Sequence, residues 1–145
     1  MTDLAQKALE EAVAWIGTPY RHQGSMKGVG CDCLGLIRGV WRALYGCEPE
    51  LAGPYSADWA EAGGHDRLME AARRHCREKA LDDALPGDIL LFRWRAQHPA
   101  KHLGILCDRG RFIHAYEGHA VMISPLISQW RRRIAGVFAF PELQR

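Results

Sequence analysis

The sequence predicts an α+β fold in which N-terminal helices pack on a C-terminal antiparallel β-sheet of about five strands. Up to about residue 80, apolar residues recur mainly with the spacing of helices. After the turn signal Leu-Pro-Gly-Asp at residues 85–88, short apolar runs and alternation typical of strands take over. A chain of 145 residues fits one domain, so residues 1–145 are expected to fold as a single unit.

Two amphipathic patterns predict helices at either end of the first half of the chain. Residues 4–16 place leucine, alanine, valine and isoleucine on one side and charged residues on the other. Residues 65–79 repeat this arrangement, with arginines on the outer side. Residues 47–64 are rich in Pro, Gly, Ala and Ser and show no clear period, which predicts irregular structure.

A central helix is expected to begin at Cys33. Asp32 is a good N-cap because its carboxylate can accept hydrogen bonds from the first turn, and Gly46 suits the position just after a helix. Apolar residues at helical spacing from Cys33 form the expected core-facing side, namely Ile37, Val40, Trp41 and Leu44.

The second half of the chain predicts five strands at short spacing. This pattern is consistent with an antiparallel meander, and the helices then cover one face of the sheet. The expected strands are residues 89–94, 103–107, 111–115, 120–124 and 134–140.

Composition argues against several classes of partner. The formal charge is only +2, and the one short basic run, residues 131–133, gives no basis for nucleic-acid binding. Five scattered cysteines, an odd number, predict reduced thiols. No apolar run approaches membrane-spanning length and the first residues lack a signal-peptide pattern, so we expect no membrane insertion and synthesis in the cytoplasm without a signal peptide.

The position of Cys33 in the first turn of a helix suggests a nucleophile. Free N–H groups and the helix dipole favour an anion there, which predicts that the pKa of the thiol falls from about 8.5 toward neutrality. The alternative is a small buried packing residue. A base near Cys33 decides between the two.

Two histidines are candidates for the base and its partner. His102 and Gly104 share one face of their strand because side chains alternate. A three-residue loop with Gly110 in a left-handed conformation would set Gly104 opposite His114, and would place His102 and His114 diagonally on one face. A two-residue loop would put them on opposite faces.

With that register the residues fit a Cys/His peptidase. Cys33 is the nucleophile, His102 the general base, and His114 the group that fixes the tautomer of His102. N–H groups at the start of the Cys33 helix would hold the oxyanion.

The competing hypothesis is a metal site built from the same residues together with Cys31. The Cys-x-Cys spacing is unlike the usual zinc knuckle, so neither a metal nor a cofactor is expected.

Five short motifs, in order along the chain, resemble those of the NlpC-type cell-wall peptidase family, a compact branch of the papain-like fold. They are Gly17-Thr18-Pro19-Tyr20, Asp32-Cys33-Leu34-Gly35-Leu36, Leu85-Pro86-Gly87-Asp88-Ile89-Leu90, His102-Leu103-Gly104-Ile105 and Phe112-Ile113-His114-Ala115. The resemblance covers most of the chain and implies the same three catalytic residues. Tyr20, His22 and Asp32 are expected to line the substrate side. Leu34 departs from the family's usual serine, and residues 22–24 depart from its usual Trp-Gly-Gly.

Residues 33–42 are also similar to the peptidases encoded with phage-tail and gene-transfer-agent modules. The primary hypothesis is a thiol peptidase of the resembled family that cleaves the γ-D-glutamyl to diamino-acid bond in peptidoglycan stem peptides. The similarity to tail-encoded peptidases implies phage-like tail or baseplate proteins as partners, and a tail that delivers the domain to the periplasm or cell wall. Two alternatives remain open: a catalytically silent tail plug or adaptor, and an amidase or acyltransferase that uses the same triad.

Overall fold

The computed structural model describes residues 2–49 and 66–142. Four α-helices lie in this part of the chain: α1 (Asp3–Ala14), α2 (Cys33–Tyr45), α3 (Arg67–His75) and α4 (Ser128–Arg131). The strands are β1 (Ser25–Met26), β2 (Gly30–Cys31), β3 (Arg77–Lys79), β4 (Ile89–Phe92), β5 (His102–Asp108), β6 (Arg111–Ala115), β7 (Val121–Pro125) and β8 (Ile134–Ala139). The fold is therefore α+β, as the sequence predicts.

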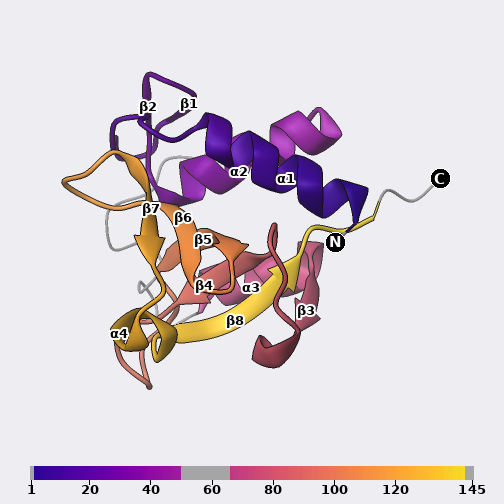
Figure 1. Ribbon diagram of the computed structural model, residues 1–145, viewed down its shortest axis with the longest axis vertical. Helices are drawn as coiled ribbons and strands as arrows, with labels where there is room; N and C mark the ends of the chain where they lie inside the picture. Colours follow the sequence, from indigo (N-terminus) through magenta and orange to yellow (C-terminus); the bar gives the residue numbers. More distant parts are fainter. Residues whose placement is uncertain (1, 50–65, 143–145) are drawn as a thin grey trace.

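The main sheet is antiparallel and has six strands in the order β3-β8-β4-β5-β6-β7. Helices α1 and α2 lie together over one face of this sheet, whereas α4 lies in the connection between β7 and β8 (Figure 1). The five predicted strands are all present. Only β4 to β7 form a simple meander, because β8 returns to pair with β4.

The predicted helix at residues 65–79 is too long. Helix α3 ends at His75, Cys76 is extended, and β3 follows as an edge strand paired with β8. Main-chain hydrogen bonds to β8 hold one side of β3, and the half-buried Lys79 side chain forms an ion pair of 2.6 Å with the buried Asp88. These long-range partners outweigh a local helical pattern. Residue 65 and most of the segment 47–64 lie outside the described residues.

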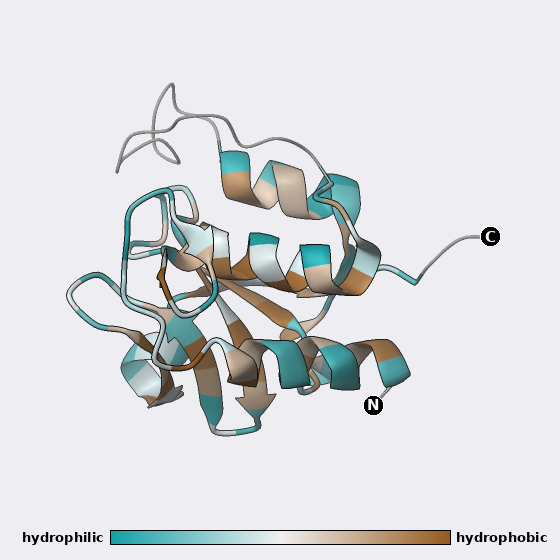
Figure 2. Ribbon diagram, turned by 90° about the horizontal axis from the view of Figure 1, so that it is seen from above, coloured by the Kyte–Doolittle hydropathy of each residue, from teal (hydrophilic) through white to brown (hydrophobic). Residues whose placement is uncertain are grey.

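Both ends of α2 agree with the sequence-based prediction. The Asp32 side chain accepts a hydrogen bond from the N–H of Gly35, and Gly46 takes the left-handed conformation (φ 83°) that ends the helix. Helix α1 covers residues 3–14 rather than 4–16, with Thr2 as its N-cap. Hydrophobic and hydrophilic residues alternate around both helices (Figure 2), as expected for helices with one buried side.

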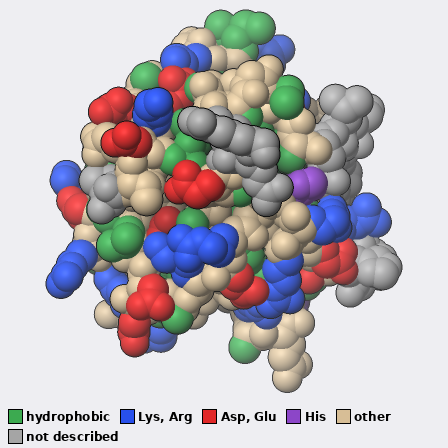
Figure 3. All heavy atoms as spheres, turned by 90° about the vertical axis from the view of Figure 1, so that its right-hand side faces the viewer, with side chains coloured by type: hydrophobic (Ala, Val, Ile, Leu, Met, Phe, Trp, Pro, Cys, Tyr) green, Lys and Arg blue, Asp and Glu red, His purple; other side chains and the backbone are tan. Residues whose placement is uncertain are grey.

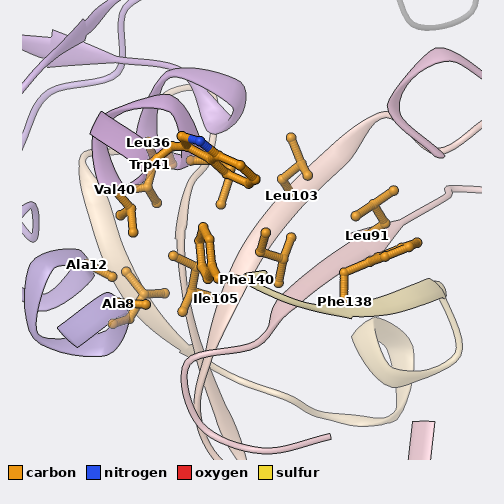
Figure 4. Packing of buried hydrophobic residues seen from close by; sticks show 14 of the residues in the cluster. Ala8, Ala12, Leu36, Val40, Trp41, Leu91, Leu103, Ile105, Phe138 and Phe140 are labelled. Carbon is orange, nitrogen blue, oxygen red and sulfur yellow. The ribbon is translucent and has the colours of Figure 1, made fainter. Parts of the chain in front are cut away.

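Glycine allows α1 and α2 to approach closely. A Cβ atom on Gly39 of α2 would lie 2.0 Å from the ring of Trp15, which is itself 2% exposed. The main apolar core lies between these helices and the sheet. In it, Ala8 and Ala12 of α1 lie close to Val40 of α2 and Ile105 of β5 (Figure 4).

A second, smaller apolar cluster lies on the sheet face away from α1 and α2. Its buried members are Leu90, Phe92, Leu106, Phe112, Leu126 and Val137. Strand β5 contributes to both clusters because its side chains alternate, with Leu103 and Ile105 toward the helices and Leu106 on the other side. His102 therefore belongs to the face opposite α2.

The β5–β6 hairpin reaches the predicted register by a different route. Ile105 pairs with Ile113 and Leu106 with Phe112, a register that sets residue 104 opposite residue 114. The register shifts by one residue between Leu106 and Asp108, so an irregularity near residue 107 replaces the predicted three-residue loop. Gly110 is not left-handed, and that part of the prediction is wrong.

The molecular surface in Figure 3 mixes Lys and Arg with Asp and Glu side chains, and neither sign gathers into one broad patch on this face. Among the residues that the structure describes, no helix is long and apolar enough to cross a membrane.

The Gly39 contact gives a first prediction. Gly39→Ala should destabilise the fold by about 1–3 kcal/mol because Trp15 must move, although alanine normally stabilises a helix interior relative to glycine. Urea unfolding measures the change. Gly110→Ala is the matched control, since a Cβ there meets no atom closer than 4.0 Å and φ is not positive. A Gly39→Ala protein as stable as the parent would contradict the packing.

Candidate active site

The site begins with the carboxylate of Asp32, which joins the start of α2 to the loop before it. One oxygen accepts the N–H of Gly35 at 2.7 Å, and the other accepts the N–H of Gln23 at 2.8 Å. Gln23 adopts a left-handed backbone conformation (φ 65°). Because Asp32 is buried, these bonds are shielded from water and fix the loop relative to Cys33.

The loop that precedes Asp32 rests directly on α2. The short β1–β2 hairpin pairs Ser25 with Cys31, and the Ser25 hydroxyl donates to the carbonyl of Gly35 at 2.6 Å. A Cβ on Gly35 would lie 1.7 Å from the carbonyl oxygen of Gly24. Glycine is therefore required at position 35, two residues after the cysteine.

Cys33 is the first residue of α2 and is half-buried. Burial raises the pKa of its thiol to about 12, and the negative charge of Asp32 acts in the same direction. Hydrogen bonds from the main-chain N–H groups of Leu103, Leu34 and Cys33 itself lower the pKa but do not offset burial. The expected fall toward neutrality is therefore wrong, because desolvation of the thiolate outweighs the helix N-terminus.

The two predicted histidines lie in direct contact. His102 Nε2 is 2.8 Å from His114 Nδ1, and both side chains are buried. His114 Nε2 is in turn 2.7 Å from the Ser124 hydroxyl oxygen. Ser124 was not predicted from the sequence, because its position beside His114 depends on the register between β6 and β7, which alternation within one strand does not determine.

Aromatic rings surround His102. Trp94 stacks on its imidazole with centroids 5.7 Å apart, and the rings of Trp130 and Tyr116 lie at 5.6 and 5.8 Å. Burial lowers the pKa of His102 to about 3, with a further contribution from the charge of His114. Burial, followed by the charge of His119, lowers the pKa of His114 to about 4. Both imidazoles are therefore neutral near pH 7.

Cys33 is connected to the start of β5 through the main chain of Leu103. The N–H of Leu103, the residue after His102, interacts with the sulfur of Cys33. Within residues 2–49 and 66–142, no hydrogen bond joins that sulfur to the His102 ring. Since Nε2 of His102 is engaged by His114, Nδ1 is the nitrogen left for the thiol proton. Hydrogen bonds of catalytic groups commonly tighten only when substrate binds.

The three residues predicted on the substrate side surround the start of α2. Tyr20 bridges to Cys31, and burial raises the pKa of its phenol to about 12, with smaller contributions from the nearby Cys33 and Asp32. His22 is exposed, and its Nδ1 lies 3.9 Å from Asp32. The Asp32 carboxylate accepts main-chain N–H groups. Their roles toward substrate remain predictions.

The residues considered for a metal site are not grouped as ligands. In the described ranges, no three His, Cys, Asp or Glu side chains are placed to hold a metal ion. Cys31 is fully buried in the core cluster beneath α2, where burial raises the pKa of its thiol to about 12.

Comparison with known proteins identifies the family of this chain. The profile of the NlpC/P60 family matches residues 17–138, which include Cys33, His102 and His114. The chain belongs to the NlpC/P60 family. Solved NlpC/P60 structures share its papain-like α+β fold.

Two relatives of this NlpC/P60 chain have described activities. The chain is 30% identical over 136 residues to a γ-DL-glutamyl hydrolase of Bacillus subtilis. The matched region covers 93% of this chain and 29% of that protein. It is 28% identical over 132 residues to the murein DD-endopeptidase MepS/murein LD-carboxypeptidase of Escherichia coli, covering 90% of this chain and 60% of that protein. The chain thus spans only part of the length of either relative.

The fold likeness extends to a solved NlpC/P60 family protein from Bacillus cereus. The two superimpose with a TM-score of 0.67 at 18% identity, over 94% of this chain and 40% of the other. At this identity the likeness concerns the fold alone.

The low pKa values of the histidines predict a specific loss of stability in acid. The unfolded chain protonates both side chains below about pH 6.5, whereas the folded protein protonates them only near pH 3 to 4. The free energy of unfolding should therefore fall as pH decreases from about 6.5, by about 2 kcal/mol for each histidine at pH 5. Urea unfolding between pH 8 and pH 5 measures this slope.

The variant His114→Gln separates these histidines from other titrating groups, which are the same in both proteins. It should lose roughly half of the pH-dependent change expected from the pair. An identical slope in the variant and the parent would contradict neutral, buried histidines.

Proposed function

We propose that this protein is a cysteine peptidase that hydrolyses the γ-D-glutamyl to diamino-acid bond of peptidoglycan stem peptides. The observation that carries the proposal is the contact of 2.8 Å between His102 Nε2 and His114 Nδ1, next to the strand start whose Leu103 N–H meets the Cys33 sulfur. Membership of a family that includes murein endopeptidases supports the substrate class. The γ-glutamyl bond is supported by the name of the Bacillus subtilis relative.

The proposed acylation forms a C–S bond and breaks the C–N bond of the peptide, and His102 carries the thiol proton to the departing amine. As the Cys33 sulfur attacks the γ-carbonyl carbon, its proton passes to Nδ1 of His102. The carbonyl oxygen gains the negative charge and accepts main-chain N–H groups at the start of α2. When the tetrahedral intermediate collapses, His102 returns the proton to the departing amine, and a thioester remains on Cys33.

Deacylation reverses these roles. His102 removes a proton from water, the resulting hydroxide attacks the thioester carbon, and the thiol leaves with the proton that His102 carries. His114 remains hydrogen-bonded to Nε2 of His102 throughout. The products are the free glutamyl carboxylate and the regenerated Cys33 thiol.

The resting site explains how reactivity is confined to the bound substrate. The raised pKa of Cys33 and the lowered pKa of His102 keep thiol and imidazole neutral at pH 7. The proton therefore moves during attack, when the developing oxyanion and imidazolium appear together. We assign substrate contacts to Tyr20, His22 and Asp32, since all three surround the start of α2.

We also propose that the domain acts within a phage-like tail, which carries it to the periplasm or cell wall and supplies tail or baseplate partners. The similarity of residues 33–42 to tail-encoded peptidases supports this assignment. Co-sedimentation with assembled particles tests it. Recovery of the protein only in the particle-free fraction would refute the tail assignment and leave the chemistry intact.

Substitution of the three catalytic residues tests the reaction. Cys33→Ala and His102→Ala should abolish release of new amino groups from purified sacculi, with changes of 10³-fold or more expected for such groups. His114→Gln should retain partial activity because an amide can still accept from His102 Nε2. Product mass spectrometry identifies the bond and separates a peptidase from an amidase or acyltransferase.

Cys47→Ala is the matched control, because Cys47 is exposed and its loss should change nothing. Full digestion by Cys33→Ala would refute the mechanism. A parent protein that releases no product from any stem peptide, yet assembles into particles, would instead support a silent tail plug.

A further inference from the structure

Ser124 extends the chain of polar groups behind His102 by one member. It lies on β7 opposite Phe112, and His114 lies opposite Met122 two residues away, so Ser124 and His114 share a sheet face. The Ser124 hydroxyl oxygen is 2.7 Å from His114 Nε2 and the residue is 8% exposed. The polar series therefore runs from His102 through His114 to Ser124.

The nitrogen that carries the proton in each imidazole decides which members of this series donate and which accept. A neutral imidazole carries one proton on one of its two nitrogens. For Nδ1 of His102 to accept the thiol proton, the ring proton of His102 must be on Nε2, where it donates to His114 Nδ1. His114 must then carry its own proton on Nε2, and the only partner of that nitrogen in the described structure is Ser124.

The opposite arrangement makes the same contacts but blocks the base. If Ser124 donates to His114 Nε2, the His114 proton is on Nδ1 and donates to His102 Nε2. The ring proton of His102 is then on Nδ1, where it cannot accept from a thiol. The heavy-atom distances are the same in both arrangements, so the direction of the Ser124 hydrogen bond selects between an active and a blocked base.

We propose that Ser124 is a positioning residue whose hydroxyl accepts the Nε2 proton of His114 and so keeps Nδ1 of His102 free. This inference rests on the proposed function for its catalytic meaning, but the tautomer it assigns is a property of the resting protein. Ser124 touches neither substrate nor the reacting sulfur and acts through His114.

Packing separates this role from a purely structural one. The His114 ring lies 4.3 Å from the Phe112 ring and 5.3 Å from the Trp130 ring, measured between centroids. These neighbours hold the imidazole in place without the serine. Ser124→Ala should therefore change where the His114 proton resides more than where the ring lies.

Nitrogen-15 NMR of histidine-labelled protein at pH 7 tests the tautomers directly. The parent should show the proton on Nε2 in both His102 and His114. Ser124→Ala should move a measurable fraction of both rings to the Nδ1–H form, and Ser124→Thr, which keeps the hydroxyl, should restore the parent signals. Nδ1–H signals for His114 in the parent, or unchanged tautomers in Ser124→Ala, would overturn the proposal.

Kinetics on a stem peptide provide the second readout. Ser124→Ala should lower kcat about 10-fold with KM unchanged, and Ser124→Thr should recover most of the loss. In a His114→Gln background, Ser124→Ala should cost nothing further, because glutamine has no ring tautomer for the serine to select. Additive losses, or a fall no larger than that of the control Ser128→Ala, would refute a role through His114.

The two readouts separate this proposal from the proposed function. A parent protein with Nε2 protons on both histidines but without peptidase activity would refute the peptidase and leave the tautomer assignment standing. Full peptidase activity with unchanged tautomers in Ser124→Ala would refute the serine's role alone.

Discussion

The carboxylate of Asp32 is the constraint on which the site depends. By accepting one N–H from α2 and one from the preceding loop, it fixes the distance between the helix start and the chain that carries Tyr20 and His22. The same negative charge raises the pKa of the neighbouring thiol. Geometry and reactivity are thus opposed at this residue: the group that positions Cys33 also disfavours its thiolate.

The sheet contributes the complementary half of the site. Because side chains alternate along β5, Leu103 packs in the core under α2 and His102 lies on the opposite, aromatic-lined face. Neighbouring residues of one strand therefore contribute to the core and to the candidate site. Burial of His102 and His114 lowers stability in mild acid. The folded protein keeps both side chains neutral there, whereas the unfolded chain protonates them, so the free energy of unfolding falls. In return, the imidazole pair is shielded from water and its hydrogen bonds are defined by the sheet register.

Sequence patterns were sufficient where local chemistry decides the structure. The caps at Asp32 and Gly46 and the five longer strands follow from spacing and turn residues. The shared face of His102 and His114 was predicted correctly, but from a loop that the structure does not contain. Strand β3 was missed because its pairing with β8, more than fifty residues later, overrides a helical pattern. The predicted left-handed conformation of Gly110 was wrong, because an irregularity near residue 107 gives the same register without it.

Properties that depend on burial could not be predicted in the same way. The pKa of Cys33 is set by how much of the chain covers the sulfur, which the helix start alone does not reveal. Ser124 lacked a signal for the same reason, since a serine on an edge strand is ordinary until the strand is placed beside His114. Spacing therefore identified the candidate catalytic residues, whereas the packed structure was needed to find their protonation states and the neighbouring serine.

The central claim is that Cys33 forms a covalent acyl intermediate with the stem peptide. Rapid mixing with a γ-D-glutamyl diamino-acid peptide, acid quenching and intact-protein mass spectrometry measure this species directly. A transient mass increase equal to the acyl portion, located on the peptide containing Cys33 and removed by hydroxylamine, is the predicted result. Product formation without any adduct on Cys33, or an adduct on another residue, would contradict the account.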